Sequence, residues 1–332
     1  MMGVQGAVDA AEAETPGGGG NGVPAAMAPS GATSPGAALS GAALPGAAPT
    51  DAPGLAERGG LTPDRVEIIG GVHVEIYGAG AGAGPGLPVL AVHGFMSSRT
   101  QWMLNLPALV AARPVAVVEL LGHGRSEAPE ALSDYAPARY FETFETIRGL
   151  MGAPRWHLCG QSFGAAMTLR YQDAHPDVVA AQVFTNSTAS FADPATPEAA
   201  ALARERAERI RAEGREGLSA HRSHPSGARR FPAAVKAAML EDAARLDPHA
   251  MACAVELTIP GVAMRHRFRA IETPTLMVNG VWEKRFQPWA AWARTALPTL
   301  RSTDLEGGHS INVEQPAAFD AAVTQFLAAY DT

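Results

Sequence analysis

Cysteine is almost absent from this sequence: Cys159 and Cys253 are the only two among 332 residues. Two thiols are too few for the disulfide framework of a small secreted domain or for a cysteine-rich metal site. Cys159 falls within an apolar run, so we interpret both residues as free thiols in a reducing compartment. The sequence therefore predicts a protein without disulfides and without a bound metal.

Charged residues are also few, at 18% of the chain, and their balance is acidic. The 26 basic and 33 acidic residues give a net charge of −7, whereas a nucleic-acid-binding protein needs a concentrated basic face. In the densest basic stretch, residues 204–230, arginines are interleaved with glutamates, which is typical of a solvated helix face. We therefore expect no nucleic-acid partner.

Long apolar runs are missing as well. No segment approaches the roughly 18 consecutive apolar residues that a membrane-spanning helix needs. The first residues, Met1 to Gln5, do not form the basic start followed by an apolar stretch that marks a secretory signal. These absences predict a cytoplasmic protein with no membrane attachment.

Large side chains are scarce in residues 1–60, which consist mostly of glycine, alanine and proline. Such a segment cannot bury enough apolar surface to offset the entropy that ordering would cost. The remaining residues, 61–332, are long enough for one domain with a sizeable core. We therefore predict a disordered tail over 1–60 followed by one folded domain.

Short apolar runs alternate with helical patterns from Val66 onward. Val66–Tyr77, interrupted by Gly70 and Gly71, predicts a β-hairpin. Further strands are predicted at Pro88–Val92, Pro114–Leu120, Trp156–Cys159, Ala181–Thr185, Pro274–Val278 and Thr299–Leu305. Helices are predicted at Arg99–Ala112, Pro137–Met151, Phe163–His175, Pro288–Ala296 and Pro316–Ala329. This alternation predicts an α/β fold, with a mostly parallel sheet of about eight strands and helices on both faces.

One interval, from about residue 187 to residue 269, breaks the alternation. It has helical periodicity and no strand run. An insertion of this size between two strands predicts a helical cap over the carboxyl ends of the strands, where open α/β sheets bind their ligands.

The strongest local motif is Gly160-Gln161-Ser162-Phe163-Gly164, which follows a predicted strand and opens a predicted helix. In that setting a Gly-x-Ser-x-Gly forms a sharp turn that exposes the serine hydroxyl. The turn also places the Phe163 N–H at a helix N-terminus, where it can stabilise a developing oxyanion. We predict that Ser162 is a nucleophile; the alternative is a glycine-rich turn with an incidental serine.

A serine hydroxyl needs an adjacent base to act as a nucleophile near neutral pH. His309, in Gly307-Gly308-His309-Ser310, lies between the last predicted strand and the last predicted helix. Its loop therefore reaches the same sheet edge as the serine turn. We predict His309 as the general base; the alternative is a histidine of a surface turn.

Glu283 follows the strand at Pro274–Val278 and could hold the imidazole in the required tautomer. The order serine, acid, histidine is the one expected for this fold. Asp193, after the Ala181–Thr185 run, is the other nearby candidate. A surface charge paired with Lys284 or Arg285 is the non-catalytic alternative for Glu283.

His93-Gly94-Phe95 directly follows another predicted strand. The glycine permits a tight turn that aims a backbone N–H, that of Phe95, at the position of an oxyanion; one such donor stabilises a transition state by about 2.7–4 kcal/mol. We interpret His93 itself, and His123 in the Gly122–Ser126 turn, as structural.

Taken together, these residues resemble the α/β-hydrolase superfamily from about Val66 to Leu327. His93-Gly94 is similar to the family's oxyanion turn, Gly122–Ser126 to its Gly-His-Gly-x-Ser turn, Gly160–Gly164 to its nucleophile elbow and Gly308-His309 to its final Gly-His. The resemblance implies a capped serine hydrolase, similar to an esterase or a lactonase. Glu283 departs from the family, which usually has an aspartate there.

The expected chemistry is acyl transfer to Ser162 followed by hydrolysis of the acyl-enzyme, without a cofactor. The expected partner is a small to mid-sized, largely apolar carboxylic ester or lactone. Trp102 and Trp282 are candidate pocket residues, with simple packing as the alternative for both. The apolar residues of the cap segment are compatible with such a substrate; they are Met251, Val255, Leu257, Ile259, Val262 and Met264.

Two other functions stay open from the sequence. The same three side chains could cleave a carbon–carbon bond or catalyse a lyase step. Alternatively, the chain could be a non-catalytic ligand-binding protein that retains the fold.

Overall fold

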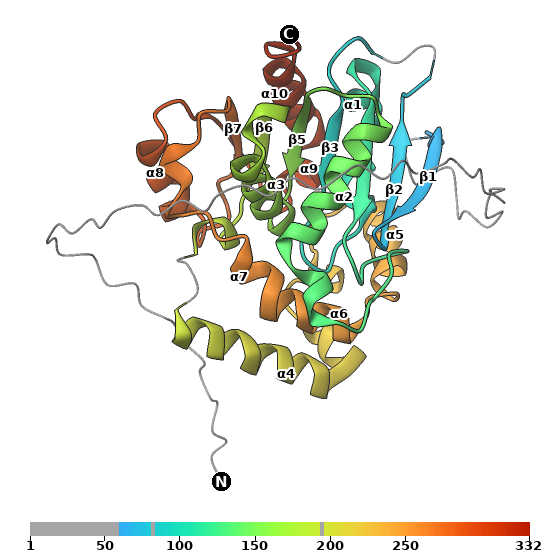
Figure 1. The fold of residues 1–332 in the computed structure, drawn as a ribbon, viewed down its shortest axis with the longest axis vertical. Coiled ribbons are helices and arrows are strands. Elements are labelled where there is room, and N and C mark those ends of the chain that lie inside the picture. The colour runs from blue at the N-terminus through green and yellow to red at the C-terminus, as the bar shows by residue number, and fades with distance from the viewer. Residues whose placement is uncertain (1–59, 81–83, 193–195) are drawn as a thin grey trace, which may run out of the picture. The chain divides into compact units, whose positions relative to one another are not determined.

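The computed structural model describes residues 60–80, 84–192 and 196–332 (Figure 1). The predicted disordered tail, apart from Gly60, lies outside these residues, and so does Asp193. None of the helices in the described part of the chain combines the length and apolar character needed to cross a membrane.

The described residues form an eight-stranded sheet, as the alternating pattern predicted. The strands are β1 (Arg65–Ile69), β2 (Val72–Tyr77), β3 (Val89–Val92), β4 (Val115–Glu119), β5 (Trp156–Gly160), β6 (Val179–Thr185), β7 (Thr275–Gly280) and β8 (Arg301–Leu305). They lie in the order β1-β2-β4-β3-β5-β6-β7-β8. β1 and β2 are antiparallel to their neighbours, and the other six strands are parallel. The predicted α/β fold with a mostly parallel sheet is confirmed.

The strand order reverses at β3, and this reversal positions the site. The chain runs from β3 outward to β4 on one side, then returns to place β5 on the other side of β3. In this parallel pair Val92, the last residue of β3, lies opposite Gly160, the last residue of β5. The turns that follow these two strands, which begin at His93 and Gln161, therefore leave the same edge side by side. Such a switch point is where open α/β sheets bind ligands.

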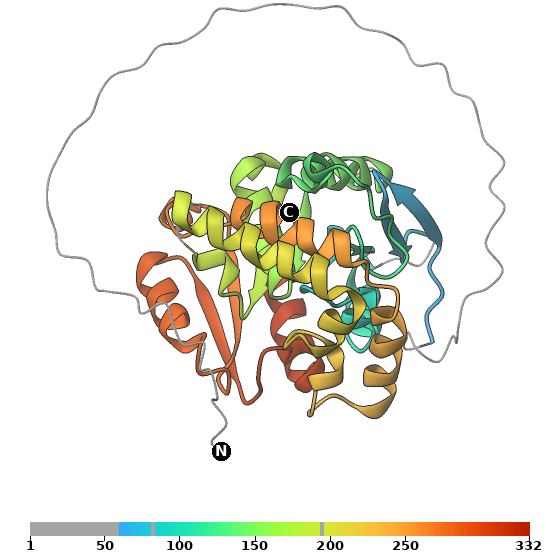
Figure 2. The same ribbon diagram turned by 90° about the horizontal axis from the view of Figure 1, so that it is seen from below.

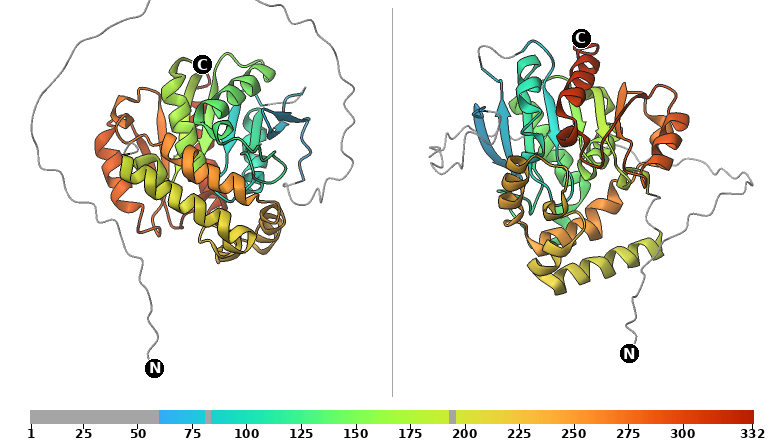
Figure 3. Two further views of the ribbon diagram at one scale, coloured as in Figure 1. Left: turned by 60° about the horizontal axis from the view of Figure 1, so that its bottom comes forward. Right: turned by 180° about the vertical axis from the view of Figure 1, so that it is seen from behind.

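Helices cover both faces of the sheet, as Figure 3 shows from two sides. They are α1 (Leu106–Ala112), α2 (Pro137–Leu150), α3 (Phe163–Ala174), α8 (Gln287–Ala296), α9 (Ile311–Glu314) and α10 (Pro316–Ala328). Side chains of β3 alternate between the two layers. Leu90 and Val92 pack in the core that contains side chains of α2 and α3, whereas Val89 and Ala91 pack in the core that contains side chains of α1 and α10. Because successive side chains of β3 enter the two cores in turn, every residue of the strand is apolar, and the sequence shows one continuous apolar run.

The prediction of one continuous helix at Arg99–Ala112 is wrong, because the structure divides this range into two separate helical segments. The structure has a 3-10 turn, η2 (Arg99–Trp102), and then α1, which begins only at Leu106. Ser98 caps the turn by accepting a hydrogen bond from the Thr100 N–H at 3.2 Å. Pro107 lies in the first turn of α1 and has no N–H to donate, so the chain starts a new helix there instead of continuing the old one.

The segment between β6 and β7, which we interpret as a cap, contributes helices and no strand among its described residues. These helices are α4 (Pro197–Ala220), α5 (Ala233–Ala243), α6 (Pro248–Cys253), the π-helix η7 (Ala254–Thr258) and α7 (Ile259–Gly261). They lie at the end of the sheet where the parallel strands finish (Figure 1), and Figure 2 shows α4 crossing in front of that edge. α4 contains one non-helical residue, Gly214, with φ of 57°. The segment thus covers the edge at which the motifs of the sequence converge.

Candidate active site

Ser162 lies in the sharp turn between β5 and α3 that its motif predicted. Its backbone has φ of 54° and ψ of −113°, a strained conformation for a residue with a side chain. The two glycines of the motif have no room for a side chain. A Cβ on Gly160 would lie 2.5 Å from the Ala165 Cα, and a Cβ on Gly164 would lie 2.2 Å from the Val92 carbonyl oxygen. The tight packing of strand against helix thus explains why glycines flank Ser162.

The structure brings Ser162, His309 and Glu283 together in one hydrogen-bonded chain. His309 Nε2 lies 2.7 Å from Ser162 Oγ. On the other side of the ring, His309 Nδ1 lies 2.9 Å from Glu283 Oε2. The three side chains come from the ends of β5, β8 and β7, respectively. A base within hydrogen-bond reach of a hydroxyl, with an acid behind it, is the arrangement that activates a serine.

Asn186 fixes the carboxylate of Glu283, and the sequence analysis missed this residue. It is fully buried just after β6, and its Nδ2 donates to Glu283 Oε2 at 2.8 Å. The same amide group binds the Gly280 backbone twice, from its Nδ2 to the carbonyl at 3.0 Å and through its Oδ1 to the N–H at 2.8 Å. Asn186 therefore joins the end of β6 to the end of β7 and holds the carboxylate toward the imidazole.

The surroundings of Glu283 favour its charged form. Burial opposes ionisation, but the hydrogen bond and charge of His309, followed by the hydrogen bond from Asn186, outweigh it and hold the pKa of the carboxyl below its usual value. The side chain is 21% exposed, so part of it still reaches solvent. Glu283 can thus hold a negative charge beside an imidazole that gains a proton.

The predicted oxyanion donors, the N–H groups of Phe95 and Phe163, have no acceptor among the described residues. Phe163 is the first residue of α3, so its N–H points out of the helix N-terminus. The next amide after Phe95 is different, because the Met96 N–H donates to His123 Nε2 at 3.1 Å. Of these two neighbouring amides, only that of Phe95 is free to bind an oxyanion.

His93 and His123 both support the turn that carries the Phe95 amide. His93 Nε2 accepts from the Leu120 N–H at 3.0 Å, and its Nδ1 donates to the Gly94 carbonyl at 2.7 Å. His123 accepts from Met96 and donates from Nδ1 to the Leu121 carbonyl at 3.0 Å. Each ring therefore needs to be neutral, with the proton on Nδ1, to make both bonds.

Acid is expected to destabilise the protein through these two histidines. Burial lowers the pKa of His93 to about 4 and that of His123 to about 3. The unfolded chain takes up protons there near pH 6.5, so lowering the pH favours unfolding. Between pH 7 and pH 5 each histidine should reduce the free energy of unfolding by about 2 kcal/mol.

Guanidinium denaturation at the two pH values measures this effect. The variant His123→Asn should be less stable than the native protein at pH 7, because the Met96 N–H loses its acceptor. It should nevertheless lose less stability than the native protein on going to pH 5. An equal loss in the two proteins would show that His123 is not a source of the acid sensitivity.

The structure places the two candidate pocket tryptophans differently. Trp102 is fully buried in the core with α10, where its ring contacts Phe319 at 6.3 Å between centroids. Trp102 therefore packs between the sheet and the layer of α1 and α10, which agrees with the packing alternative. Trp282, next to Glu283, is 52% exposed, and the guanidinium of Arg230 lies 5.7 Å from its ring centre.

The cap segment supplies two further residues beside the site that the sequence gave no signal for. The His221 ring contacts the Phe95 ring edge-on at 5.9 Å, and Phe95 in turn contacts Phe163 at 6.3 Å. Arg230 Nη2 donates to Glu314 Oε1 at 3.2 Å. Among the described residues there is no cluster of three or more histidine, cysteine, aspartate or glutamate side chains suited to a metal ion.

Comparison with known proteins agrees with this geometry. The model of the alpha/beta hydrolase family matches residues 89–322, more than two thirds of the chain. A protein of Bacillus subtilis (strain 168), with the provisional name 2-succinyl-6-hydroxy-2,4-cyclohexadiene-1-carboxylate synthase, is 26% identical over 257 residues. That alignment covers 72% of this chain and 89% of the relative.

Solved structures share the fold. MenH from S. aureus has a TM-score of 0.68 at 18% identity, covering 78% of this chain and 99% of that one. The enol-lactonase from Burkholderia xenovorans LB400 has a TM-score of 0.66 at 21% identity, covering 80% of this chain and 100% of that one. Because the family model matches most of its length, the chain belongs to the alpha/beta hydrolase family. It is an enzyme of that family.

Proposed function

We propose that this enzyme hydrolyses a carboxylic ester or lactone of a small to mid-sized, largely apolar substrate through an acyl-enzyme. The observation that carries the proposal is the continuous chain of hydrogen bonds from Ser162 through His309 to Glu283, with distances of 2.7 Å and 2.9 Å. The proposed partner is thus a small molecule. A cytoplasmic location stays a prediction.

In the first step, Ser162 Oγ attacks the carbonyl carbon while His309 Nε2 takes the hydroxyl proton. The carbonyl oxygen becomes an oxyanion between the N–H groups of Phe95 and Phe163. Glu283 stabilises the imidazolium that forms. His309 then returns the proton to the departing alkoxide, which leaves as an alcohol, and the acyl group stays on Oγ.

In the second step, water replaces the alcohol. His309 takes a proton from the water as its oxygen attacks the acyl carbon, and the same two N–H groups hold the second oxyanion. Collapse of this intermediate breaks the bond to Ser162 Oγ, which regains its proton from His309. The products are the carboxylic acid and the free enzyme, so no cofactor enters the balance.

The alternative within enzymes is a carbon–carbon bond hydrolase or a lyase that uses the same three side chains. The similarity to a relative provisionally named as a carboxylate synthase favours keeping this second candidate. A panel of p-nitrophenyl esters and lactones, tested beside vinylogous diketones, separates the two. We expect turnover of the esters or lactones and none of the diketones; turnover of the diketones alone would replace the proposal by the second candidate.

The alternative outside enzymes is a protein that keeps the fold and binds a ligand without catalysing a reaction. A fluorophosphonate probe separates it, because the probe forms a covalent bond only with an activated serine. We expect the native protein to be labelled. An unlabelled native protein would favour the ligand-binding function.

A further inference from the structure

Two short segments that follow the catalytic turns meet in the core. η2 begins four residues after Phe95, and α9 begins two residues after His309. Gln101 Nε2 in η2 donates to Asn312 Oδ1 in α9 at 2.8 Å, and Asn312 Nδ2 donates back to the Gln101 carbonyl at 2.7 Å. All of these amide groups are buried. The two segments therefore form one platform behind the oxyanion turn and the base.

The cap helix α5 lies on this platform. Its buried side chains Val235 and Met239 pack in one small apolar cluster with Met103, which follows η2, and Val313, which belongs to α9. The cluster thus contains residues from the cap, from the segment after the oxyanion turn and from the segment after the base. A shift of α5 would disturb both segments at once, because packed interiors have few voids to absorb movement.

Asp242, at the last turn of α5, binds the segment after the oxyanion turn through a buried carboxylate. Its Oδ2 accepts from Ser98 Oγ at 2.7 Å and from Thr100 Oγ1 at 2.6 Å. Both of its oxygens lie 3.3 Å from Arg99 Nη1. The residue is only 6% exposed. Three consecutive residues, 98–100, are therefore held by one side chain of the cap.

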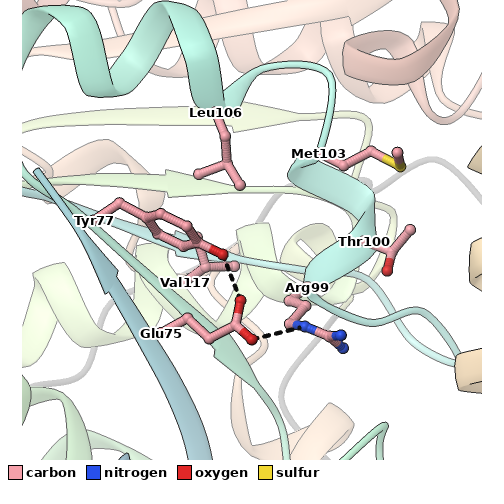
Figure 4. A pocket seen from close by; sticks show the side chains of 7 residues that line it. All are labelled: Glu75, Tyr77, Arg99, Thr100, Met103, Leu106 and Val117. Carbon is pink, nitrogen blue, oxygen red and sulfur yellow. Dashed lines mark hydrogen bonds and ion pairs between the residues drawn. The ribbon is translucent and has the colours of Figure 1, made fainter. Parts of the chain in front are cut away.

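Arg99 is itself held by side chains of the sheet, so Asp242 binds a group that is already fixed in place. Its Nε donates to Glu75 of β2 at 3.0 Å, and its Nη1 donates to Glu119 of β4 at 2.7 Å. Figure 4 shows the Glu75 carboxylate between Arg99 and the Tyr77 hydroxyl, which donates to it at 2.6 Å. The cavity beside Arg99 has a volume of about 10 Å³, enough for no more than one water molecule. No ligand larger than a water molecule therefore fits beside these charges.

The opposite end of α5 approaches the base. Arg230, three residues before the helix, pairs with Glu314 of α9. Glu314 Oε2 also accepts from the Gly308 N–H at 2.9 Å, directly before His309. The cap helix is thus tied at one end to the oxyanion side and at the other end to the base side.

We propose that Asp242 is a positioning residue, which holds α5 on the platform and so fixes the Phe95 amide relative to His309. The inference rests on the proposed function, since it concerns the same serine chemistry. Stability alone does not require this carboxylate, because a buried ion pair gains little over well-packed apolar side chains. A buried carboxylate with all its hydrogen bonds made holds residues 98–100 in one defined geometry. The turn that starts at His93 leads directly into these residues, so its geometry is fixed as well.

The test compares Asp242→Ala with Glu241→Ala, a matched loss of a carboxylate at the neighbouring, exposed position of the same helix. Arg99 keeps Glu75 and Glu119 in the first variant, so its charge stays paired. With p-nitrophenyl acetate, we expect kcat of Asp242→Ala to fall about 10- to 100-fold, because small displacements of catalytic groups are costly. KM should stay within twofold, and Glu241→Ala should retain the native kcat and KM.

A folded Asp242→Ala variant whose kcat lies within threefold of the native value would overturn the inference, and so would an equal fall in Glu241→Ala. Circular dichroism establishes folding. If Asp242→Ala does not fold, the double variant Ser98→Ala, Thr100→Val decides by the same criterion, because it removes two donors and keeps the ion pair with Arg99. Native protein that neither hydrolyses the ester nor reacts with a fluorophosphonate would instead refute the proposed function, and the inference with it.

Discussion

Replacement of Ser162 by alanine is expected to lower kcat for an aryl ester by about a million-fold. In the proposed mechanism the acyl-enzyme forms through Ser162 Oγ, which lies 2.7 Å from His309 Nε2. Among the described residues, no other hydroxyl makes a hydrogen bond with that nitrogen. What remains in the variant is substrate binding and the oxyanion donors, which together still exceed the uncatalysed rate. The measurement is kcat with p-nitrophenyl acetate, with the native enzyme titrated for active sites.

Labelling by a fluorophosphonate provides a second readout, because Ser162→Ala should take up no probe. Ser310→Ala is the matched control. Ser310 follows His309 directly, and its side chain makes no capping bond at the start of α9. This variant should label and turn over at the native rate. Persistent labelling of Ser162→Ala, or its loss in Ser310→Ala, would place the nucleophile elsewhere.

The sequence predicted the sheet and the two central catalytic candidates because their signals are local. A strand such as Val89–Val92, buried on both faces, is a continuous apolar run in any context. The serine motif is local too. Its two glycines are required because a Cβ at either position would collide with the turn itself or with the adjacent strand. His309 could be paired with Ser162 because the carboxyl ends of parallel strands meet at one edge.

The supporting residues could not be predicted, because their roles depend on contacts between distant parts of the chain. Asn186 reaches Glu283 only since β6 pairs with β7 and brings Thr185 opposite Val278. Asp242 meets Ser98 across 144 positions of sequence. A buried asparagine or aspartate has no periodic signature, so composition and spacing do not reveal it. For Trp102, the sequence left both a pocket role and simple packing open for a related reason: its neighbours in sequence do not tell which face of the sheet it joins.

Glu283→Gln should lower kcat by about 1,000- to 10,000-fold. The native Oε2 accepts from both His309 and Asn186, at 2.9 Å and 2.8 Å. The amide oxygen of glutamine can occupy this position and keep both hydrogen bonds, so the variant mainly removes the negative charge. Without it, the imidazolium that forms as Ser162 attacks has no counter-charge in the Asn186–Glu283–His309 chain, and the transition state rises in free energy.

Two further variants make the Glu283 prediction specific to this carboxylate. Glu283→Asp keeps the charge but shortens the side chain by one methylene, so its oxygen cannot meet His309 and Asn186 at the native distances; we expect a fall of about 100-fold in kcat. Asp193→Asn tests the other acid that the sequence allowed, and it should retain the native kcat. Loss of activity in Asp193→Asn together with native activity in Glu283→Gln would reverse the assignment.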